Sequence, residues 1–279
     1  MRLRPPWLLL LPSIVLLVAL FGWPLVQGVL EAFRDDGGFT LAHWERLFAD
    51  ANFWRALRNT LLLIVIVVPV QLALAIGMAL LMQARPKFAG GHFYLWCIPL
   101  AISELAAGLV WLSIFDNRGY LNSLLVGLGL SENGVQWLNY ENTTTMLLTV
   151  VIAEIWRATS LVFVIVVAGV QMIPREYDEA AQVFGASFWQ RLRHVTLPLL
   201  GPSLQVALIL RTILALQAFA VAQALTGRDF PLLVGETYEW YVNLQNPAVA
   251  SAVALVVLVI SLGTAVLYLR TVRQPEGAR

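Results

Sequence analysis

The chain has 279 residues, of which 59% are hydrophobic and 13% are charged, and its net charge is +1. Soluble domains are about 25% charged, so this composition indicates an integral membrane protein. With a net charge near zero, nothing in the sequence suggests nucleic acid, whose binding would need a basic stripe. A single cysteine, Cys97, excludes a disulfide scaffold and a cysteine-based metal site.

Six apolar segments are long enough to cross the ~30 Å hydrocarbon core, which needs about 20 helical residues. They run roughly over 7 to 31, 57 to 83, 94 to 115, 146 to 171, 198 to 224 and 249 to 270. The first segment is longer than the apolar region of a signal peptide, and no A-x-A site follows it. We therefore expect a retained first helix and a single all-α transmembrane domain over residues 1–279.

The distribution of Lys and Arg predicts the orientation in the membrane. With six spans, both termini lie on one side, together with the 84–93 link and the 172–197 loop. That side carries ten basic residues, against six on the other; the ten are Arg2, Arg4, Arg85, Lys87, Arg175, Arg191, Arg193, Arg270, Arg273 and Arg279. Basic residues favour the cytoplasmic face. We expect the termini and the 172–197 loop to be cytoplasmic.

A polar interval from Glu179 to Pro202 separates two of the apolar spans. Pro174 suits the first turn of a helix, and the acidic residues after it are favoured there by the helix dipole. We expect a short helix from about residue 175, a bend at Gly185 and a second helix from Ser187 to Val195. A generic interfacial loop is the alternative.

Small residues and a proline complete this interval. Ala180 and Ala181 keep one helix face thin, so that a partner protein can approach its backbone closely, and Leu197 with Pro198 restarts the chain as a membrane span. The chain has no G-x-x-x-x-G-K-[ST] phosphate loop, so a partner must hydrolyse ATP if ATP drives it. The histidines, His43, His92 and His194, lie too far apart to predict a metal site or a catalytic triad.

The interval resembles the EAA loop of ABC importer permeases, which carries Glu-Ala-Ala, then Gly, then Leu-Pro at these intervals. Over nearly its whole length the chain also resembles the binding-protein-dependent sugar permeases of the maltose, trehalose and glycerol-3-phosphate class. The blocks that carry this resemblance include Trp54-Arg-Ala-Leu-Arg-Asn-Thr, Gly119-Tyr-Leu-Asn-Ser-Leu-Leu and Leu225-Thr226-Gly227.

The resemblance implies a type I permease fold with six transmembrane helices in the cell membrane. It implies that the residues coupling transport to the ATPase are Glu179, Ala180, Ala181, Gly185, Ala186, Leu197 and Pro198. The implied partners are a second homologous permease, an ATPase dimer that uses ATP and Mg, an extracytoplasmic solute-binding lipoprotein, membrane lipid and a sugar. This chain itself would bind no cofactor and no metal and hold no catalytic residue.

Three departures from the family pattern stand out. The family usually has an acidic residue before the loop glycine, where this chain has Phe184. It usually has an Asp after the aromatic residue at position 219, where this chain has Ala220. Arg228 to Pro231 replaces a Gly-Gly-Pro sequence. The first departure bears on ATPase docking, and the other two bear on the substrate.

Ionisable residues within apolar spans cost about 2.5–3.5 kcal/mol each on insertion scales and mark a polar cavity or pathway. Glu104, Glu154, Arg157 and Arg211 qualify. Glu154 and Arg157 are three residues apart on one helix face, so they can pair. Arg211 lies deep in its span and needs a carboxylate partner, for which Glu104 and Glu154 are the candidates. A structural ion pair and a sugar contact both remain open.

In the resembled family, polar and aromatic side chains on the helices before and after the loop hold the sugar. This directs attention to Glu154, Arg157 and Ser160 before the loop, and to Gln217, Phe219 and Gln223 after it. Amide and carboxyl groups satisfy sugar hydroxyls, and an aromatic ring covers the apolar sugar face. For Gln217 and Gln223, hydrogen bonding between helices is the alternative, and the role of Glu104 is equally open.

The sequence therefore predicts a permease subunit of an ATP-driven importer for a carbohydrate such as trehalose or maltose. The first alternative is an ion-coupled secondary transporter, in which Glu104, Glu154 and Arg211 would form an ion relay. Such a transporter predicts an inverted repeat, and none is visible. The second alternative, a membrane enzyme, would need a convergent catalytic cluster.

Overall fold

The computed structural model describes residues 7–84 and 87–271, and the fold is helical apart from one short ribbon of β1 (Arg34–Asp35) and β2 (Gly38–Phe39). In these ranges five helical stretches are long and apolar enough to cross a membrane, and a bent helix pair brings the number to six. The expected all-α fold is confirmed. Five basic residues used for the orientation, Arg2, Arg4, Arg85, Arg273 and Arg279, lie outside the described residues.

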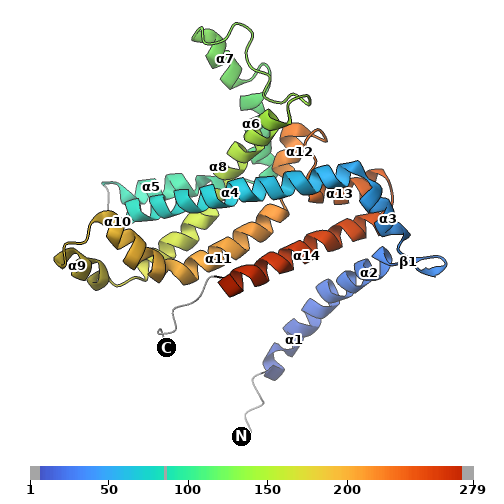
Figure 1. Cartoon of the computed structure of the whole chain (residues 1–279), viewed down its shortest axis with the longest axis horizontal. Coiled ribbons are helices and arrows are strands. Elements are labelled where there is room, and N and C mark those ends of the chain that lie inside the picture. The colour runs from blue at the N-terminus through green and yellow to red at the C-terminus, as the bar shows by residue number, and fades with distance from the viewer. Residues whose placement is uncertain (1–6, 85–86, 272–279) are drawn as a thin grey trace.

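The central bundle consists of four long helices that run side by side (Figure 1). They are α4 (Ala51–Gln83), α8 (Thr143–Gln171), α11 (Leu197–Leu216) and α14 (Pro247–Thr271). The side chain of Asp50 caps α4 by accepting from the Asn52 N–H, and Asn142 caps α8 in the same way. Ala75 and Ala79 of α4 are fully buried against α8, because small residues allow two membrane helices to approach closely.

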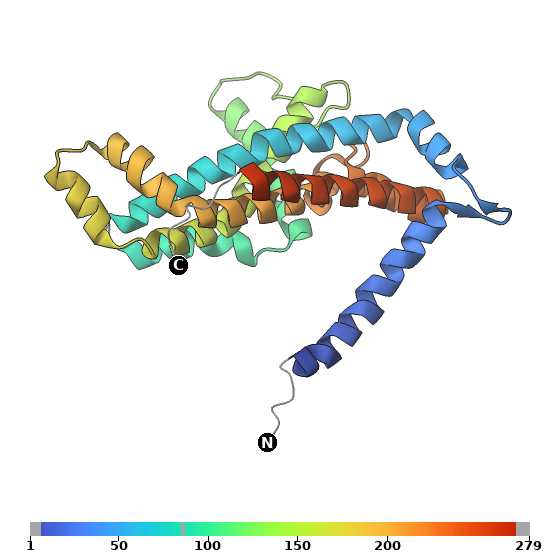
Figure 2. The same ribbon diagram turned by 60° about the horizontal axis from the view of Figure 1, so that its bottom comes forward.

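The first span stands apart from this bundle. It consists of α1 (Trp7–Leu17), a π-helical turn over Val18–Gly22 and α2 (Trp23–Ala32). Figures 1 and 2 show α1 pointing away from the other helices, whereas the far end of α2 approaches α14. The apolar side chains from Leu10 to Phe21 are exposed in the isolated chain. This span therefore has little protein surface of its own to pack against.

The apolar segment expected as one span over 94 to 115 is broken in the structure. It comprises α5 (Ala89–Cys97), a 3₁₀ turn (Ile98–Ala101) and α6 (Glu104–Phe115), with α7 (Tyr120–Gly127) beyond, and the two halves meet at 100°. Pro99 starts the 3₁₀ turn, and Ser103 caps the new helix by accepting from the Ala106 N–H. The break therefore leaves the start of α6 with a local hydrogen-bond acceptor.

A second break divides the segment expected as a span over 198 to 224. Helix α11 ends at Leu216, and α12 (Ala220–Thr226) begins after Phe219. Helices α6 and α12, which follow the two breaks, pack tightly on each other. A Cβ at Gly108 of α6 would lie 2.7 Å from the Ala224 Cβ and 3.2 Å from the Val221 Cα of α12. We call these two helices the α6/α12 pair.

The 172–197 loop forms two helices at one end of the bundle, opposite β1 (Figure 1). Helix α9 (Arg175–Val183) starts at the predicted residue. Helix α10 (Phe188–Arg191) continues through a π-helical turn (Leu192–Thr196) into α11. Leu197 and Pro198 therefore do not restart a span, because one helical run extends from Phe188 to Leu216. Pro198 lacks an N–H for the helix ladder, and the wider π turn precedes it.

The opposite end of the bundle carries α3 (Ala42–Ala49), α13 (Leu233–Tyr238) and a π-helical turn over Glu239–Asn243. Here Arg228 forms an ion pair with Glu239 at 2.6 Å. Glu236 is also buried, and its neighbours are Asp50, Arg55, Arg228 and Glu239. Burial, and secondarily the carboxylates, raise the pKa of Glu236 above its ordinary 4.5, although the two arginines oppose this shift.

We expect Gly108→Ala to destabilise the protein, because the new methyl group would overlap Ala224 across the α6/α12 contact. Overpacking of this kind costs about 1–3 kcal/mol. The matched control is Gly77→Ala in α4, where a Cβ has no neighbour within 4 Å. Thermal unfolding in detergent should show a lower midpoint for Gly108→Ala alone. Equal midpoints for the two variants would contradict the tight contact.

We expect Glu236→Gln to change how stability depends on pH. Since the folded-state pKa is raised, the folded chain binds this proton more tightly than the unfolded chain, and stability falls as pH rises from the ordinary pKa through the raised one. Glutamine cannot ionise, so the variant does not lose stability in this way as the pH rises. The variant should therefore melt above the wild type at about pH 8, with the difference shrinking as the solution is acidified toward the ordinary pKa. A pH-independent difference would contradict the shift.

Candidate functional site

Five polar side chains from four helices meet inside the bundle. Gln71 lies on α4, Glu104 at the start of α6, Glu154 and Arg157 on α8, and Arg211 on α11. Their hydrogen bonds and ion pairs form one continuous chain from Gln71 to Glu104. We call it the polar chain. It joins the long helices to the α6/α12 pair.

One end of the polar chain is completely buried. Arg211 donates from Nη2 to Glu154 at 2.9 Å and from Nε to the Gln71 side-chain oxygen at 2.5 Å. The Gln71 amide in turn donates to the backbone oxygen of Glu154 at 2.7 Å. All three residues are at most 2% exposed. This triad neutralises the buried charges and fixes α4, α8 and α11 relative to one another.

The other end of the polar chain is more open. Arg157 uses Nη2 to reach Glu104 at 2.9 Å and Glu154 at 3.3 Å, and the side chains of Arg157 and Glu104 are 15% and 44% exposed. The pairing of Glu154 with Arg157, expected from their spacing, is confirmed, as is a carboxylate partner for Arg211. Sequence reasoning missed Gln71. Its only signal was a lone amide in an apolar span, two residues after Pro69.

Ser160, the third residue expected before the loop, joins helices in this structure. Its hydroxyl donates to the backbone oxygen of Trp96 at 2.8 Å, and the residue is 1% exposed. The bond ties α8 to α5. The hydroxyl is thus already engaged with the protein backbone.

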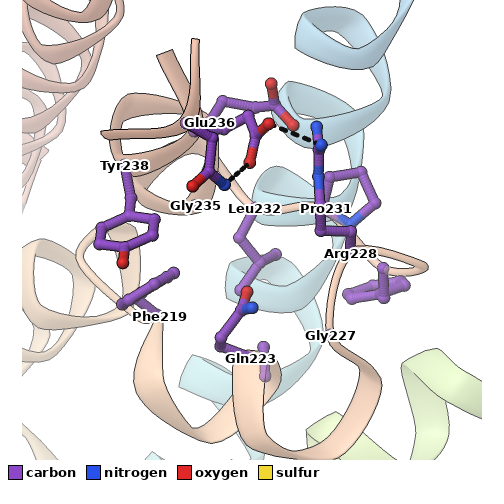
Figure 3. A pocket seen from close by; sticks show the side chains of 13 residues that line it. Phe219, Gln223, Gly227, Arg228, Pro231, Leu232, Gly235, Glu236 and Tyr238 are labelled. Atoms are coloured by element: carbon purple, nitrogen blue, oxygen red, sulfur yellow. Dashed lines mark hydrogen bonds and ion pairs between the residues drawn. The ribbon is translucent and has the colours of Figure 1, made fainter. Parts of the chain in front are cut away.

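The residues expected after the loop separate into two places. Phe219 and Gln223 line a cavity of about 60 Å³ between α12 and α13 (Figure 3). The Phe219 ring lies against Tyr238, with centroids 5.6 Å apart, and Arg228 with Glu239 closes the other side. This cavity places an aromatic surface beside an amide, two kinds of group that contact sugars. Its volume corresponds to about two water molecules, so it would have to widen to admit a sugar ring.

Gln217 does not line this cavity. It is exposed at the end of α11 and lines an apolar groove of about 530 Å³ between α2, α11 and α14. The structure thus brings Glu104, Glu154, Arg157 and Arg211 together in the polar chain. Phe219 and Gln223 lie in a separate cavity. Gln217 belongs neither to the polar chain nor to that cavity.

Polar contacts join the two helices of the 172–197 loop. Asp178 of α9 accepts from Arg191 of α10 at 2.7 Å and from Gln182 at 2.8 Å. Ser187 and Gln190 form a reciprocal capping box at the start of α10. Gly185 joins the two helices with φ +75°, a left-handed conformation that strains any other residue type. The Asp178–Arg191 pair therefore connects α9 directly to α10.

The tip of this loop exposes apolar surface. Val183, Phe184 and Trp189 are 86%, 90% and 73% exposed. Glu179 and Ala180 are also exposed, Ala181 and Ala186 are half-buried, and Leu197 and Pro198 lie at the entry to α11. Glu179 lines a cavity of about 360 Å³ together with Arg175, Arg191 and the end of α4. Large exposed apolar side chains gathered on one short loop are typical of a protein-binding surface.

Known proteins resemble the chain over almost all of its length. It is 31% identical to a probable ABC transporter permease protein of Brucella suis biovar 1 (strain 1330), covering 97% of each chain. It is 32% identical to the sulfoquinovosyl glycerol transport system permease protein SmoG of Agrobacterium fabrum, covering 96% of this chain and 90% of that one. Identity to the trehalose/maltose transport system permease protein MalF of Thermococcus litoralis is 29%, covering 96% and 93%.

A solved structure shows the same fold. It is a bacterial ABC transporter involved in the import of the acidic polysaccharide alginate, with a TM-score of 0.83 at 21% identity, covering 97% of this chain and 95% of that one. The sequence model for the binding-protein-dependent transport system inner membrane component matches residues 47–274. This chain therefore belongs to the family of binding-protein-dependent transport system inner membrane components.

Proposed function

We propose that this chain is a permease subunit of an ATP-driven importer that moves a carbohydrate across the cytoplasmic membrane. The observation that carries the proposal is the unbroken helical run from Phe188 in the loop to Leu216 past Arg211. Movement of the loop would reach the centre of the bundle without an intervening joint. Family membership favours this function over the ion-coupled alternative.

The proposed energy source is an ATPase dimer that docks on the α9 and α10 loop. The thin face at Ala180 and the apolar tip at Val183 and Phe184 suit a groove in a partner protein. Phe184 replaces the acidic residue of the family pattern, so the contact at this position is apolar rather than charged. ATP and Mg would be used by the partner, and the loop and both termini would face the cytoplasm.

A second, homologous permease is the proposed neighbour within the membrane. The first span has little surface of its own to pack against, and the groove between α2, α11 and α14 is lined mostly by apolar side chains. Helices of a second subunit would cover both. An extracytoplasmic solute-binding lipoprotein would deliver the solute to the end that carries α3 and α13.

The proposed cargo is an uncharged sugar such as trehalose or maltose. In the polar chain each arginine is paired with a carboxylate, and the most exposed group is the Glu104 carboxylate. A carboxylate that remains exposed repels an anion, and this favours a neutral cargo. The aromatic cavity at Phe219 and Tyr238 would cover the apolar face of a neutral sugar ring.

We expect Glu179→Lys and Gly185→Asp to abolish sugar uptake in cells while leaving membrane insertion intact. Both residues lie in the docking loop, and Gly185 has a backbone that Asp adopts only with strain. Uptake should fall at least about fivefold, the low end of typical coupling between sites. Glu132→Lys, the same charge change at an exposed residue distant in sequence, is the control. Normal uptake in both loop variants would contradict the docking role, and uptake stopped by an uncoupler but not by vanadate would favour the ion-coupled alternative.

We expect Phe219→Ala to weaken sugar recognition, because it removes the aromatic surface of the cavity in Figure 3. Aromatic contacts of this kind contribute about 0.5–1.5 kcal/mol, so the trehalose concentration for half-maximal stimulation of the purified complex's ATPase should rise roughly 2- to 12-fold. Tyr140→Ala, at an exposed loop residue, serves as the control. An unchanged concentration dependence would exclude Phe219 from recognition.

A further inference from the structure

The polar chain has one directional tie to the α6/α12 pair. Glu104 is the first residue of α6, immediately after the break at Ile102 and Ser103. Its carboxylate reaches across to Arg157 of α8 at 2.9 Å. Helices α6 and α8 also meet through Trp111 and Trp156, whose ring centroids are 5.9 Å apart. The α6/α12 pair also packs on α4 and α8 through a buried apolar cluster that includes Phe115 and Val221. These apolar contacts lack the directionality of the ion pair.

The fixed end of the polar chain cannot open easily. The Arg211 guanidinium is only 2% exposed. Removing Glu154 would leave its charge without an opposite charge, and removing Gln71 would leave its Nε without an acceptor, both of which are unfavourable in a buried site. Arg211 Nη1 already finds no hydrogen-bond partner among the described residues. Arg211, Glu154 and Gln71 therefore form an anchor that persists when the helices move.

The contact at the open end can break at little energetic expense. If Glu104 leaves, Arg157 keeps Glu154 at 3.3 Å, so no buried charge loses its last partner. Glu104 itself is already 44% exposed, and exposed ion pairs contribute little to stability. The Glu104–Arg157 contact is weak and directional, and it lies at the start of α6, just after the break at Ser103. Such a contact can form in one conformation of the transporter and break in another.

We propose that Glu104 is a positioning residue for transport: through Arg157 it holds the α6/α12 pair in the arrangement of this structure and releases it when the transporter switches access. The anchor of Gln71, Arg211 and Glu154 keeps Arg157 in place in both states. This inference rests on the proposed function. In this role Glu104 affects the balance between the two conformations of the transporter and does not contact the sugar.

The test compares Glu104→Gln with the wild type in the complete transporter, reconstituted in liposomes with its ATPase, partner permease and binding protein. The readouts are ATPase activity without sugar, maximal activity with trehalose, the trehalose concentration at half stimulation, and the melting temperature. Glu132→Gln is the control at an exposed acid. Gln71→Ala, which removes a group from the anchor, is the reference for a fall in melting temperature.

We expect Glu104→Gln to change the ratio of stimulated to basal ATPase by about 1.5- to 5-fold, the range that an exposed ion pair supplies. Its melting temperature should stay at the wild-type value, whereas Gln71→Ala should melt lower. Glu104→Asp keeps the charge on a shorter side chain and should fall between the wild type and Glu104→Gln. The Glu132→Gln ratio should equal that of the wild type.

Three results would overturn the inference. The first is an unchanged ratio in Glu104→Gln. The second is a change confined to the trehalose concentration at half stimulation, which would make Glu104 a sugar contact. The third is a drop in melting temperature matching that of Gln71→Ala, which would make the role structural. A wild-type complex that no sugar stimulates would instead contradict the proposed function, and this inference with it.

Discussion

The buried ion pair between Arg211 and Glu154 is the constraint on which the arrangement of the bundle depends. A guanidinium inside an apolar span must be neutralised, and Glu154 supplies the opposite charge at 2.9 Å. Gln71 then fixes the rotation of α4, because its amide bonds both Arg211 and the Glu154 backbone. The three helices are held at one register by these contacts, while apolar packing alone would allow them to slide.

The broken spans lie outside the anchored helices. The long helices α4, α8 and α11 are tied together by the anchor. The chain leaves helical geometry just before Glu104 and just after Leu216. Both helices that follow, α6 and α12, pack on each other through Gly108. The bundle thus comprises an anchored part and a paired part. Ile102 and Ser103 separate α6 from the preceding 3₁₀ turn, and residues 217–219 separate α12 from α11.

Much of this could be predicted from the sequence, because charges in apolar spans are costly and must find partners. The spacing of Glu154 and Arg157 and the depth of Arg211 predicted their pairing. The role of Gln71 could not be predicted, since a neutral amide in a span can bond to many neighbours. The break near Ile102 was also hidden, because hydropathy is continuous across it and Pro99 alone marks a change of backbone. The family resemblance grouped Gln217 with Phe219, and the continuous apolar run conceals the end of α11 that separates them.

The loop at the other end of α11 shows how a local constraint acts over a distance. Asp178 and Arg191 hold α9 against α10, and the helix from Phe188 onward contains no non-helical link before Arg211. A displacement at the loop is therefore carried to the anchor, and the anchor passes it to α4 and α8 through Gln71 and Glu154. The α6/α12 pair packs on α4 and α8 through an apolar cluster that includes Phe115 and Val221. Its position relative to the anchored helices therefore depends on non-directional contacts together with the Glu104–Arg157 ion pair. Relative movement between these two parts is what a change of access requires.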